Sequence, residues 1–468
     1  MFTWRNGKVI VLSLASCLLS LSPLSSYSED HPPPPPDIIL FSIDTLRADH
    51  LGCYGYERET SPFIDSFVND GVLFEHVISQ SAHTAPSHMS IFTALLPDVH
   101  GVSNYTGGKN QRLAPLNPTL AEVLRDHGYM TVGIHGGGNV DAGHGFDTGF
   151  DYYEKDFNLD STRPGEIPPE INYWIDRSRE AGKPLFLFLH HYFCHVPYLH
   201  GPRALRCAVL KEPVEGLPTG PGDLTREQLK DNSEFWKMVD ISDPRQRAHL
   251  VALYDGGILI ADHLFRKTVE LLKQKGIYKD SMIILTSDHG EEFYEHGSKG
   301  HGTLFIEHLH VPLVIKFPGG KYAGKRIDSY VRLVDLMPLI CQMADSPLPP
   351  GKQGISFLPL LAGEGFYHPL IVSNHAGKGY ELRFYKDGYV YADKKYQGVP
   401  EWLFDPEKDP HEQKNLAGEK PEVLKKMRKA AEEAKAEKYK FTRGLEKVVE
   451  PPPPSEELKK QLKALGYL

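Results

Sequence analysis

Apolar runs alternate with amphipathic segments over most of the chain. Continuous apolar stretches typical of buried strands occupy residues 38–43, 131–134, 185–189, 282–286 and 311–317. Patterns with helical spacing lie between them, at residues 89–96, 117–128 and 256–275, and the last two end at glycines. This β-α alternation predicts an α/β fold in which a mostly parallel central sheet carries helices on both faces.

The pattern changes after about residue 370. Residues 381–396 alternate between polar and apolar, are rich in aromatic residues, and contain Gly388 at a turn, which predicts antiparallel hairpin strands. Residues 421–440 form a charged amphipathic helical pattern, whose lysines we interpret as a solvated face, and prolines 451–454 separate it from a last short helix. We therefore expect a catalytic domain at 37–345, a small α+β subdomain with antiparallel strands at 346–418, and a charged helical tail at 419–468.

The N-terminus has the pattern of a targeting segment. Arg5 and Lys8 precede an apolar run over residues 9–24, and the small residues Ser26 and Ser28 follow it. The run is short and Pro23 interrupts it, which disfavours a membrane span. We predict a signal peptide at 1–28, a stiff proline-rich linker at 29–36, and export to the periplasm or out of the cell.

A lipid anchor is the alternative for this segment. Leu14-Ala15-Ser16-Cys17 looks like a bacterial lipoprotein box, which would leave a lipid on Cys17. Apolar residues continue past Cys17, which favours simple secretion. Beyond the signal, Cys194 and Cys207 bracket a short loop that a disulfide would close in an oxidising compartment, although spacing does not determine the pairing.

Composition narrows the function classes. The chain has 468 residues, of which 40% are hydrophobic, enough for a large core. Its net charge of −9 disfavours a nucleic-acid-binding protein, which would usually carry a basic face. No C-x-x-C pair is present, which argues against a thiolate zinc site.

Polar residues follow the predicted strands where a parallel sheet binds its ligands. They are Asp44 after the first strand, His190, His191 and His195 after the strand at 185–189, and Asp288-His289 after the strand at 282–286. Carboxylate and imidazole are ligands for divalent metals. The recurrence of these residues at three strand ends predicts a metal site built around Asp44, Asp288 and His289.

Thr84 precedes the helix predicted at 89–96, and Pro86 falls in its first turn. A hydroxyl at a helix N-terminus sits where backbone N–H groups favour negative charge, so Thr84 is a candidate nucleophile activated by the metal. The alternative is that Thr84 is only a helix N-cap.

Several segments together resemble the sulfatases of the alkaline-phosphatase superfamily. The matching segments occur in the same order along the chain as in that family, and together they cover nearly the whole chain after the linker. They are Phe41 to Gly52, Thr84-Ala85-Pro86-Ser87-His88 with Thr93 and His100-Gly101-Val102, Cys194-His195-Val196-Pro197-Tyr198, Tyr254-Asp255 through Asp262, Thr286 to Glu291, His296-Gly297, His301-Gly302-Thr303, Val311-Pro312-Leu313, and Leu403 to Leu416.

The resemblance implies an alkaline-phosphatase-like fold and one divalent cation. The implied ligands are Asp44, Thr84, Asp288 and His289. The cation is Ca²⁺ by resemblance, and the Asp288-His289 pair also admits Mn²⁺ or Zn²⁺. His195 and His301 would approach the substrate's oxygens, and His88 would stand where sulfatases place an arginine that steadies the nucleophile.

Three positions depart from the sulfatase pattern. Sulfatases convert a cysteine or serine to formylglycine, and Thr84 cannot become an aldehyde because its β-carbon carries a methyl group. His301 stands where sulfatases usually have lysine. Their Gly-Lys-x-His segment is replaced by residues 133–139. This segment contains three consecutive glycines but lacks the Lys-Ser/Thr ending of a P-loop. We interpret it as a loop that directs Asn139 toward the site.

The combined reading is an exported, sulfatase-like, metal-dependent hydrolase of small-molecule or glycan esters. It would cleave sulfate or phosphodiester-type esters through a covalent Thr84 intermediate. A threonyl ester lacks the formylglycine route of release, so water must attack sulfur or phosphorus directly, which favours phosphodiesters or phosphonate esters. The alternatives are a phospho-headgroup transferase, which would usually carry several membrane helices, and a non-catalytic glycan-binding relative, against which the retained metal residues argue.

Overall fold

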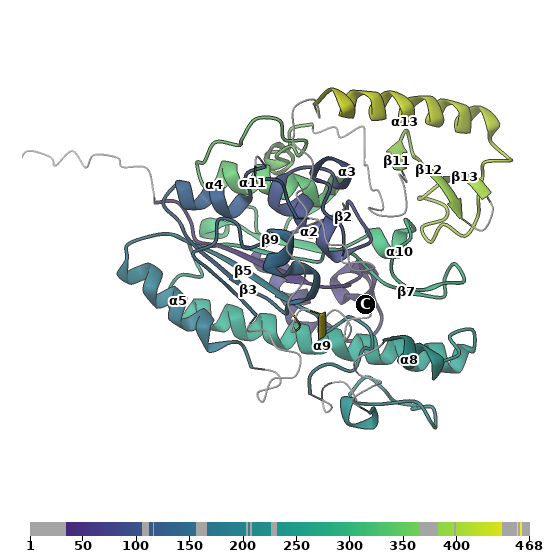
Figure 1. Ribbon diagram of the computed structural model, residues 1–468, viewed down its shortest axis with the longest axis horizontal. Coiled ribbons are helices and arrows are strands. Elements are labelled where there is room, and N and C mark those ends of the chain that lie inside the picture. The colour runs from purple at the N-terminus through teal and green to yellow at the C-terminus, as the bar shows by residue number, and fades with distance from the viewer. Residues whose placement is uncertain are drawn as a thin grey trace, which may run out of the picture. The chain divides into compact units, whose positions relative to one another are not determined.

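An eight-stranded sheet forms the centre of the computed structural model, in the order β10-β2-β9-β6-β1-β5-β3-β4 (Figure 1). The strands are β1 (Ile38–Ile43), β2 (Val72–Ile78), β3 (Met130–Ile134), β4 (Tyr152–Glu154), β5 (Leu185–His191), β6 (Met282–Thr286), β9 (Leu313–Lys316) and β10 (Arg326–Arg332). Strand β9 pairs antiparallel with β2 and β6, and the other pairings are parallel. The predicted mostly parallel sheet is therefore confirmed.

The structure describes residues 34–441 except 105–111, 116, 156–165, 203–204, 206–207, 226–231, 366–381 and 397–398, together with 456, 459 and 460. The predicted signal peptide, Cys17, Cys207 and most of the short helix after the last prolines lie outside the described residues. The predicted Cys194–Cys207 disulfide and the domain boundaries remain predictions.

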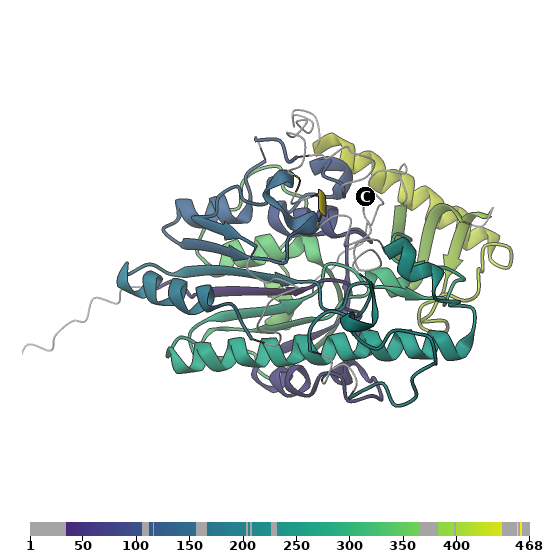
Figure 2. The ribbon, with the colours of Figure 1, turned by 60° about the horizontal axis from the view of Figure 1, so that its bottom comes forward.

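Helices cover both faces of the sheet (Figure 2). Alternate residues of β1 point to opposite sides, so Ile39 and Phe41 join one apolar core while Ile38 and Leu40 join the other. The first core packs under α1 (Pro62–Phe67), α5 (Pro169–Glu180) and α9 (Pro244–Gln274). The second packs under α2 (Thr84–Thr93), α4 (Leu120–Asp126), α11 (Leu336–Met343) and α12 (Leu358–Leu361). Short helices α3 (Pro97–His100), α8 (Asn232–Lys237) and α10 (Ile306–Leu309) lie in the connections.

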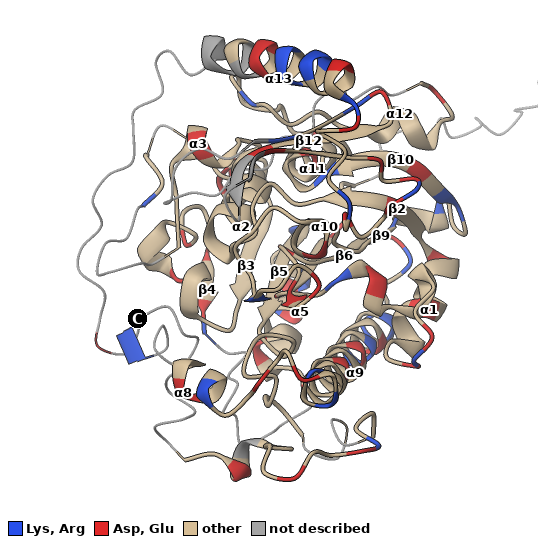
Figure 3. Ribbon diagram, turned by 90° about the vertical axis from the view of Figure 1, so that its right-hand side faces the viewer, with Lys and Arg blue, Asp and Glu red and all other residues tan. Residues whose placement is uncertain are grey.

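A second, three-stranded antiparallel sheet lies near the C-terminus, as predicted. It contains β11 (Leu382–Lys386), β12 (Tyr389–Tyr396) and β13 (Val399–Phe404), and Gly388 makes the first turn with a φ of +79°. Helix α13 (Pro421–Phe441) packs on this sheet, because Met427 and Ala431 bury against Phe384, Tyr391 and Leu403. Both basic and acidic residues lie along α13 (Figure 3).

Several predicted elements have different bounds in the structure. Strand β5 continues through His190 and His191, because these pair with Ser42 and Ile43 of β1. Helix α2 begins at Thr84 and ends at Thr93, since Pro86 is tolerated in a first turn and Ala94 adopts a left-handed φ of +52°. Strand β9 begins at Leu313 instead of residue 311.

The long helix begins twelve residues before the predicted start at 256. Asp243 caps α9 by accepting a hydrogen bond from Arg245 N, and Pro244 takes the first helical position. Gly257 in its middle allows the Phe193 carbonyl to approach, because a Cβ there would lie 2.4 Å from that oxygen. The helix thereby packs closely against the loop that follows β5. Among the described residues, no helix is long and apolar enough to cross a membrane.

Candidate metal centre and nucleophile

Asp44, Asp288 and His289 meet at the carboxyl ends of two neighbouring strands. Strands β1 and β6 are parallel and pair Ser42 with Thr286, so the residues that follow them come side by side. One ligand atom from each of Asp44, Asp288 and His289 lies within 4.8 Å of the others, and all three side chains are buried. This is a compact set of two carboxylates and one imidazole, the donor types that divalent metals accept.

The two carboxylates lack hydrogen-bond partners on the atoms that a cation would need. Asp44 Oδ1 and Asp288 Oδ2 are buried without a hydrogen-bond partner in the structure. Burial and repulsion by Asp288 raise the pKa of Asp44 well above its usual range. Burial opposes ionisation of Asp288 as well, but His289, His88 and two backbone N–H groups together hold its pKa below the usual value. A divalent cation would satisfy both oxygens and relieve this repulsion, so the residues fit a metal.

Thr84 stands directly over this set. Its Oγ1 donates toward Asp44 Oδ2 at 3.2 Å and lies 3.3 Å from His289 Nε2. The residue is the first of α2, and the extended residue before it, His83, occupies the N-cap position. The alternative that Thr84 is the N-cap is therefore wrong. Its hydroxyl faces two of the three candidate metal ligands, next to the N-terminus of a ten-residue helix.

His88 lies one turn further along α2, behind Thr84. Its Nε2 lies 2.9 Å from Ser42 Oγ, and its Nδ1 lies 3.0 Å from the Thr84 carbonyl and 3.4 Å from Asp288 Oδ2. Burial lowers the pKa of this imidazole, so it is neutral near pH 7. His88 thus supports the Thr84 backbone by hydrogen bonding, with no permanent charge of the kind an arginine would bring.

His195 and His301 lie beside each other next to His289. The ring centroids of His195 and His301 are 5.2 Å apart, and those of His301 and His289 are 4.5 Å apart. His195 Nδ1 lies 2.8 Å from the Val196 carbonyl, and burial with repulsion from His301 lowers its pKa well below the usual value. His301 Nδ1 lies 3.3 Å from Glu291 Oε1, which orients the ring. The two histidines predicted to approach the substrate are thus neighbours in the fold.

Four residues near the centre received no role from the sequence. Asn104 Oδ1 accepts a 2.8 Å hydrogen bond from Ala85 N and its amide lies 3.5 Å from His83 Nδ1. His83 in turn packs 5.7 Å from His301, between ring centroids. His190 Nε2 approaches Asp44 Oδ2 to 3.4 Å, and Glu291 supports His301. The position of His190 at a strand end marked it as a candidate. No sequence pattern indicated Asn104, because it lies in a connection after α3.

Two other candidates lie at the edge of the centre or outside it. Asn139 is buried, and its backbone N–H donates to Tyr192, whose ring lies 5.6 Å from that of His195. Asp262, in a segment that resembles the family, accepts hydrogen bonds from Phe63 N and Ile64 N at the start of α1 instead. Arg47 directs its guanidinium to Asp49 and Glu295, so it adds no cation to the centre.

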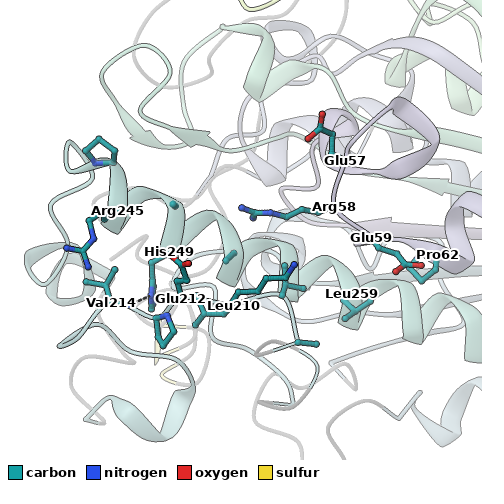
Figure 4. Close-up of a pocket in the computed structure, with 17 residues that line it drawn as sticks. Glu57, Arg58, Glu59, Pro62, Leu210, Glu212, Val214, Arg245, His249 and Leu259 are labelled. Atoms are coloured by element: carbon teal, nitrogen blue, oxygen red, sulfur yellow. Dashed lines mark hydrogen bonds between the residues drawn. The ribbon is translucent and has the colours of Figure 1, made fainter.

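A separate cavity of about 1100 Å³ lies on another part of the surface (Figure 4). It is lined by the 57–62 segment, residues 208–214 and one side of α9, including Arg58, Arg245 and His249. None of the predicted site residues lines it. Residues 208–214, which follow His195 along the chain, therefore line this separate cavity.

Two family models and one curated relative, all of them sulfatases, match most of the chain. The family model described as Sulfatase matches residues 36–346, and the model of the N-sulphoglucosamine sulphohydrolase C-terminal region matches residues 294–437. An N-acetylglucosamine-6-O-sulfatase of Bacteroides thetaiotaomicron is 24% identical, with 90% of this chain and 89% of the relative covered.

Solved structures share the fold. One, determined in complex with its substrate D-glucosamine-2-N,6-O-disulfate, has a TM-score of 0.70 at 19% identity and covers 87% of this chain and 98% of its own. The phosphonate monoester hydrolase of Agrobacterium radiobacter has a TM-score of 0.65 at 20% identity, covering 86% and 96%. The sheet and its helices are thus those of a known architecture.

Proposed function

Because the chain belongs to the sulfatase family of the alkaline-phosphatase superfamily, we propose that it is an exported metal-dependent hydrolase with Thr84 as its nucleophile. Its substrates are esters whose transferring group carries one negative charge. We expect phosphodiesters and phosphonate monoesters to be the better substrates and sulfate monoesters to be the weaker ones. The observation that carries this proposal is the Thr84 hydroxyl, which contacts both Asp44 and His289 inside a buried acidic set.

Asp44, Asp288 and His289 would hold the cation, with Thr84 as the fourth ligand. When bound, the metal lowers the pKa of a neighbouring hydroxyl and neutralises charge on the transferring group. By analogy with the family, the cation would be Ca²⁺. Two aspartates and one imidazole are also donors that Mn²⁺ or Zn²⁺ accepts. As the oxygen attacks, the Thr84 hydroxyl proton passes to Asp44 Oδ2, which already accepts a hydrogen bond from that hydroxyl, and it returns to Thr84 when water breaks the covalent bond.

The reaction proceeds in two displacements. Thr84 Oγ1 attacks phosphorus or sulfur, the bond to the leaving oxygen breaks, and His195 or His301 donates a proton to that oxygen. Water then attacks the same phosphorus or sulfur, the bond to Thr84 Oγ1 breaks, and one of the two histidines takes the proton from water. Burial disfavours the charged form of His195, so once this imidazole is protonated it releases the proton readily to the leaving oxygen, and the proton taken from water in the second step restores it.

Charge balance favours a singly charged transferring group. Two aspartates and a divalent cation sum to zero, and burial keeps His88, His195 and His289 neutral, with the pKa of His289 lowered to about 4. A phosphate monoester dianion would meet little positive charge here, whereas a phosphodiester or sulfate monoester carries one negative charge. Thr84 then selects phosphorus, because the threonyl ester must be released by direct attack of water.

A substrate panel tests the proposal. The purified protein should be assayed with aryl phosphodiester, aryl phosphonate monoester and aryl sulfate, each with Ca²⁺, Mn²⁺ or Zn²⁺. We expect metal-dependent turnover, fastest with a phosphorus ester. Absence of turnover with every pairing, together with absence of bound metal, would contradict a catalytic role and favour a glycan-binding relative.

Export is part of the proposal, and the N-terminal pattern supports it. Intact mass and N-terminal sequencing of the protein from fractionated cells should show cleavage near Ser28. A mass that corresponds to a chain beginning at a lipid-modified Cys17 would instead establish the lipoprotein alternative.

A further inference from the structure

Two cation–aromatic pairs stand around the short hairpin that precedes His301. The hairpin consists of β7 (Glu292–Phe293) and β8 (Lys299–Gly300). Lys299 Nζ lies 4.7 Å from the ring centroid of Trp236, and the Arg247 guanidinium lies 5.7 Å from that of Tyr294. We propose that Lys299 and Trp236 form a subsite for a negatively charged sugar on the alcohol side of the scissile ester, with Arg247 and Tyr294 at its edge.

Lys299 is tied to the His301 side of the centre. It lies two residues before His301 and pairs across the hairpin with Phe293. Phe293 is buried, and its ring lies 5.6 Å from that of Tyr198 and 5.1 Å from that of Tyr254. The hairpin therefore cannot move freely, and it holds the Lys299 backbone close to His301.

Trp236 is tied to the His195 side. It belongs to α8 and packs on Tyr198, with ring centroids 6.2 Å apart, while its neighbour Phe235 packs on the same tyrosine at 6.3 Å. Tyr198 is buried and lies three residues after His195. Tyr198 thus contacts both Phe293 and Trp236, and the Lys299–Trp236 pair lies where the loops of His195 and His301 meet.

The charge of Lys299 is available to a ligand. Lys299 is exposed, and its side chain takes part in no ion pair within the part of the chain that the structure describes. Asp240 is the acidic group on which it acts electrostatically, but hydrogen bonds from Ser242 occupy the Asp240 carboxylate. An exposed lysine over an indole at this position attracts anions.

The chemistry of the pair selects the ligand class. A half-buried indole offers an apolar surface to the C–H face of a pyranose ring, and an ammonium beside it binds a carboxylate or sulfate on that ring. Arg247 adds a second cation from α9 over Tyr294. The residues that line the cavity of Figure 4 do not include Lys299, Trp236, Tyr294 or Arg247, so this subsite is distinct from that cavity.

This inference rests on the proposed function, because it places the subsite on the leaving-group side of Thr84. The test compares two esters of the class that the protein hydrolyses best, a 4-nitrophenyl ester and the same ester with a carboxylate on the ring. Comparing the ratio of their kcat/KM values between variants cancels the difference in leaving-group reactivity. We expect Lys299→Gln to lower the charged-to-neutral ratio about fivefold, Lys299→Arg to restore it, and high salt to shrink it in the wild type.

The matched control is Lys321→Gln, since Lys321 Nζ lies 4.8 Å from the Tyr322 ring centroid, in a connection remote from the site in sequence. It should leave both the ratio and the activity unchanged. An unchanged ratio in both Lys299→Gln and Trp236→Ala would overturn the subsite while leaving the proposed function standing.

A binding measurement separates the two proposals. Glucuronate and glucose should be titrated against wild type and Lys299→Gln, with binding followed by saturation-transfer NMR and folding checked by circular dichroism. We expect glucuronate to bind several-fold more tightly than glucose to the wild type, and the difference to disappear in Lys299→Gln. Equal binding of both sugars to both proteins would reject the subsite, even if no ester were hydrolysed.

Discussion

Thr84 Oγ1 donates a hydrogen bond to Asp44 Oδ2 at 3.2 Å, across 40 residues of sequence. The contact exists because β1 delivers Asp44 at its carboxyl end and α2 begins at Thr84 on the same edge of the sheet. It places a hydroxyl where a nucleophile would need to be, beside two buried carboxylates that each have one oxygen without a hydrogen-bond partner in the structure. The predictions below begin from this contact.

Thr84→Ala should reduce kcat by about a thousandfold or more, because it removes the attacking oxygen. Thr84→Ser should retain part of the activity. Mass spectrometry of wild type quenched during turnover should find the peptide with Thr84 heavier by a phosphoryl or sulfuryl group. Thr268→Ala is the matched control, since Thr268 is also buried and donates its hydroxyl to the Leu264 carbonyl of α9. Full activity of Thr84→Ala would remove Thr84 as the nucleophile.

Asp44→Asn should stabilise the metal-free protein and abolish stabilisation by metal. The substitution removes one of two buried carboxylates that repel each other, and it removes a proposed ligand. Wild type at a metal concentration 100 times Kd should gain about 2.7 kcal/mol, visible as a rise in Tm that EDTA reverses.

Scanning calorimetry with parallel metal analysis makes this measurement. Asp262→Asn serves as control, because its buried carboxylate binds the start of α1 and should leave metal content unchanged. Equal metal content in Asp44→Asn and wild type would contradict the assignment.

Glu307 should contribute folding stability that is lost at acidic pH. Burial opposes its ionisation, but hydrogen bonds from His296 and His411 and the charge of Arg47 lower its pKa from 4.5 to about 2. A lowered carboxyl pKa contributes stability above pH 4.5, and that stability is lost as pH falls from 4.5 toward 2. Glu307→Gln should therefore cost about 3 kcal/mol at pH 6 and progressively less toward pH 2.

Urea unfolding at several pH values checks this dependence. The same contact raises the pKa of His296, so the contribution of His296 is present at low pH and is lost as pH rises through its raised value. A cost of Glu307→Gln that stays constant between pH 6 and pH 3 would contradict the argument.

The ion pair between Arg383 and Glu412 should hold the turn that follows His301. Both side chains are buried, Arg383 donates to the Leu304 carbonyl at 2.9 Å, and Glu412 accepts from Ile306 N at 3.2 Å. Arg383→Met should cost about 3–5 kcal/mol, because it leaves a buried carboxylate unpaired.

The double variant Arg383→Met with Glu412→Gln should be more stable than Arg383→Met alone, since neither charge then remains buried. Thermal unfolding and kcat/KM of the three variants measure the effect. Losses that simply add in the double variant would show that the two residues act independently.

Much of the architecture followed from hydrophobic patterning. Runs such as 38–43 and 282–286 mark strands because a strand covered on both faces must be apolar throughout, and the aromatic alternation at 381–396 marks a sheet with one wet face. The ends of the helices and strands were harder to predict than their presence. Strand β5 includes His190 and His191, because pairing with β1 outweighs their polarity, and α9 starts at Pro244, far from its most regular apolar stretch.

The sequence by itself determined that acidic and imidazole side chains follow parallel strands, which concentrates Asp44, Asp288 and His289 at one sheet edge. Only the tertiary structure decided what surrounds them. Asn104, His83 and Glu291 reach the centre through packing of loops distant in sequence, and Trp236 meets Lys299 because both lie against the Tyr198–Phe293 contact. Local periodicity specifies which face of an element is buried, but it contains no information about which loops come together once those faces are packed.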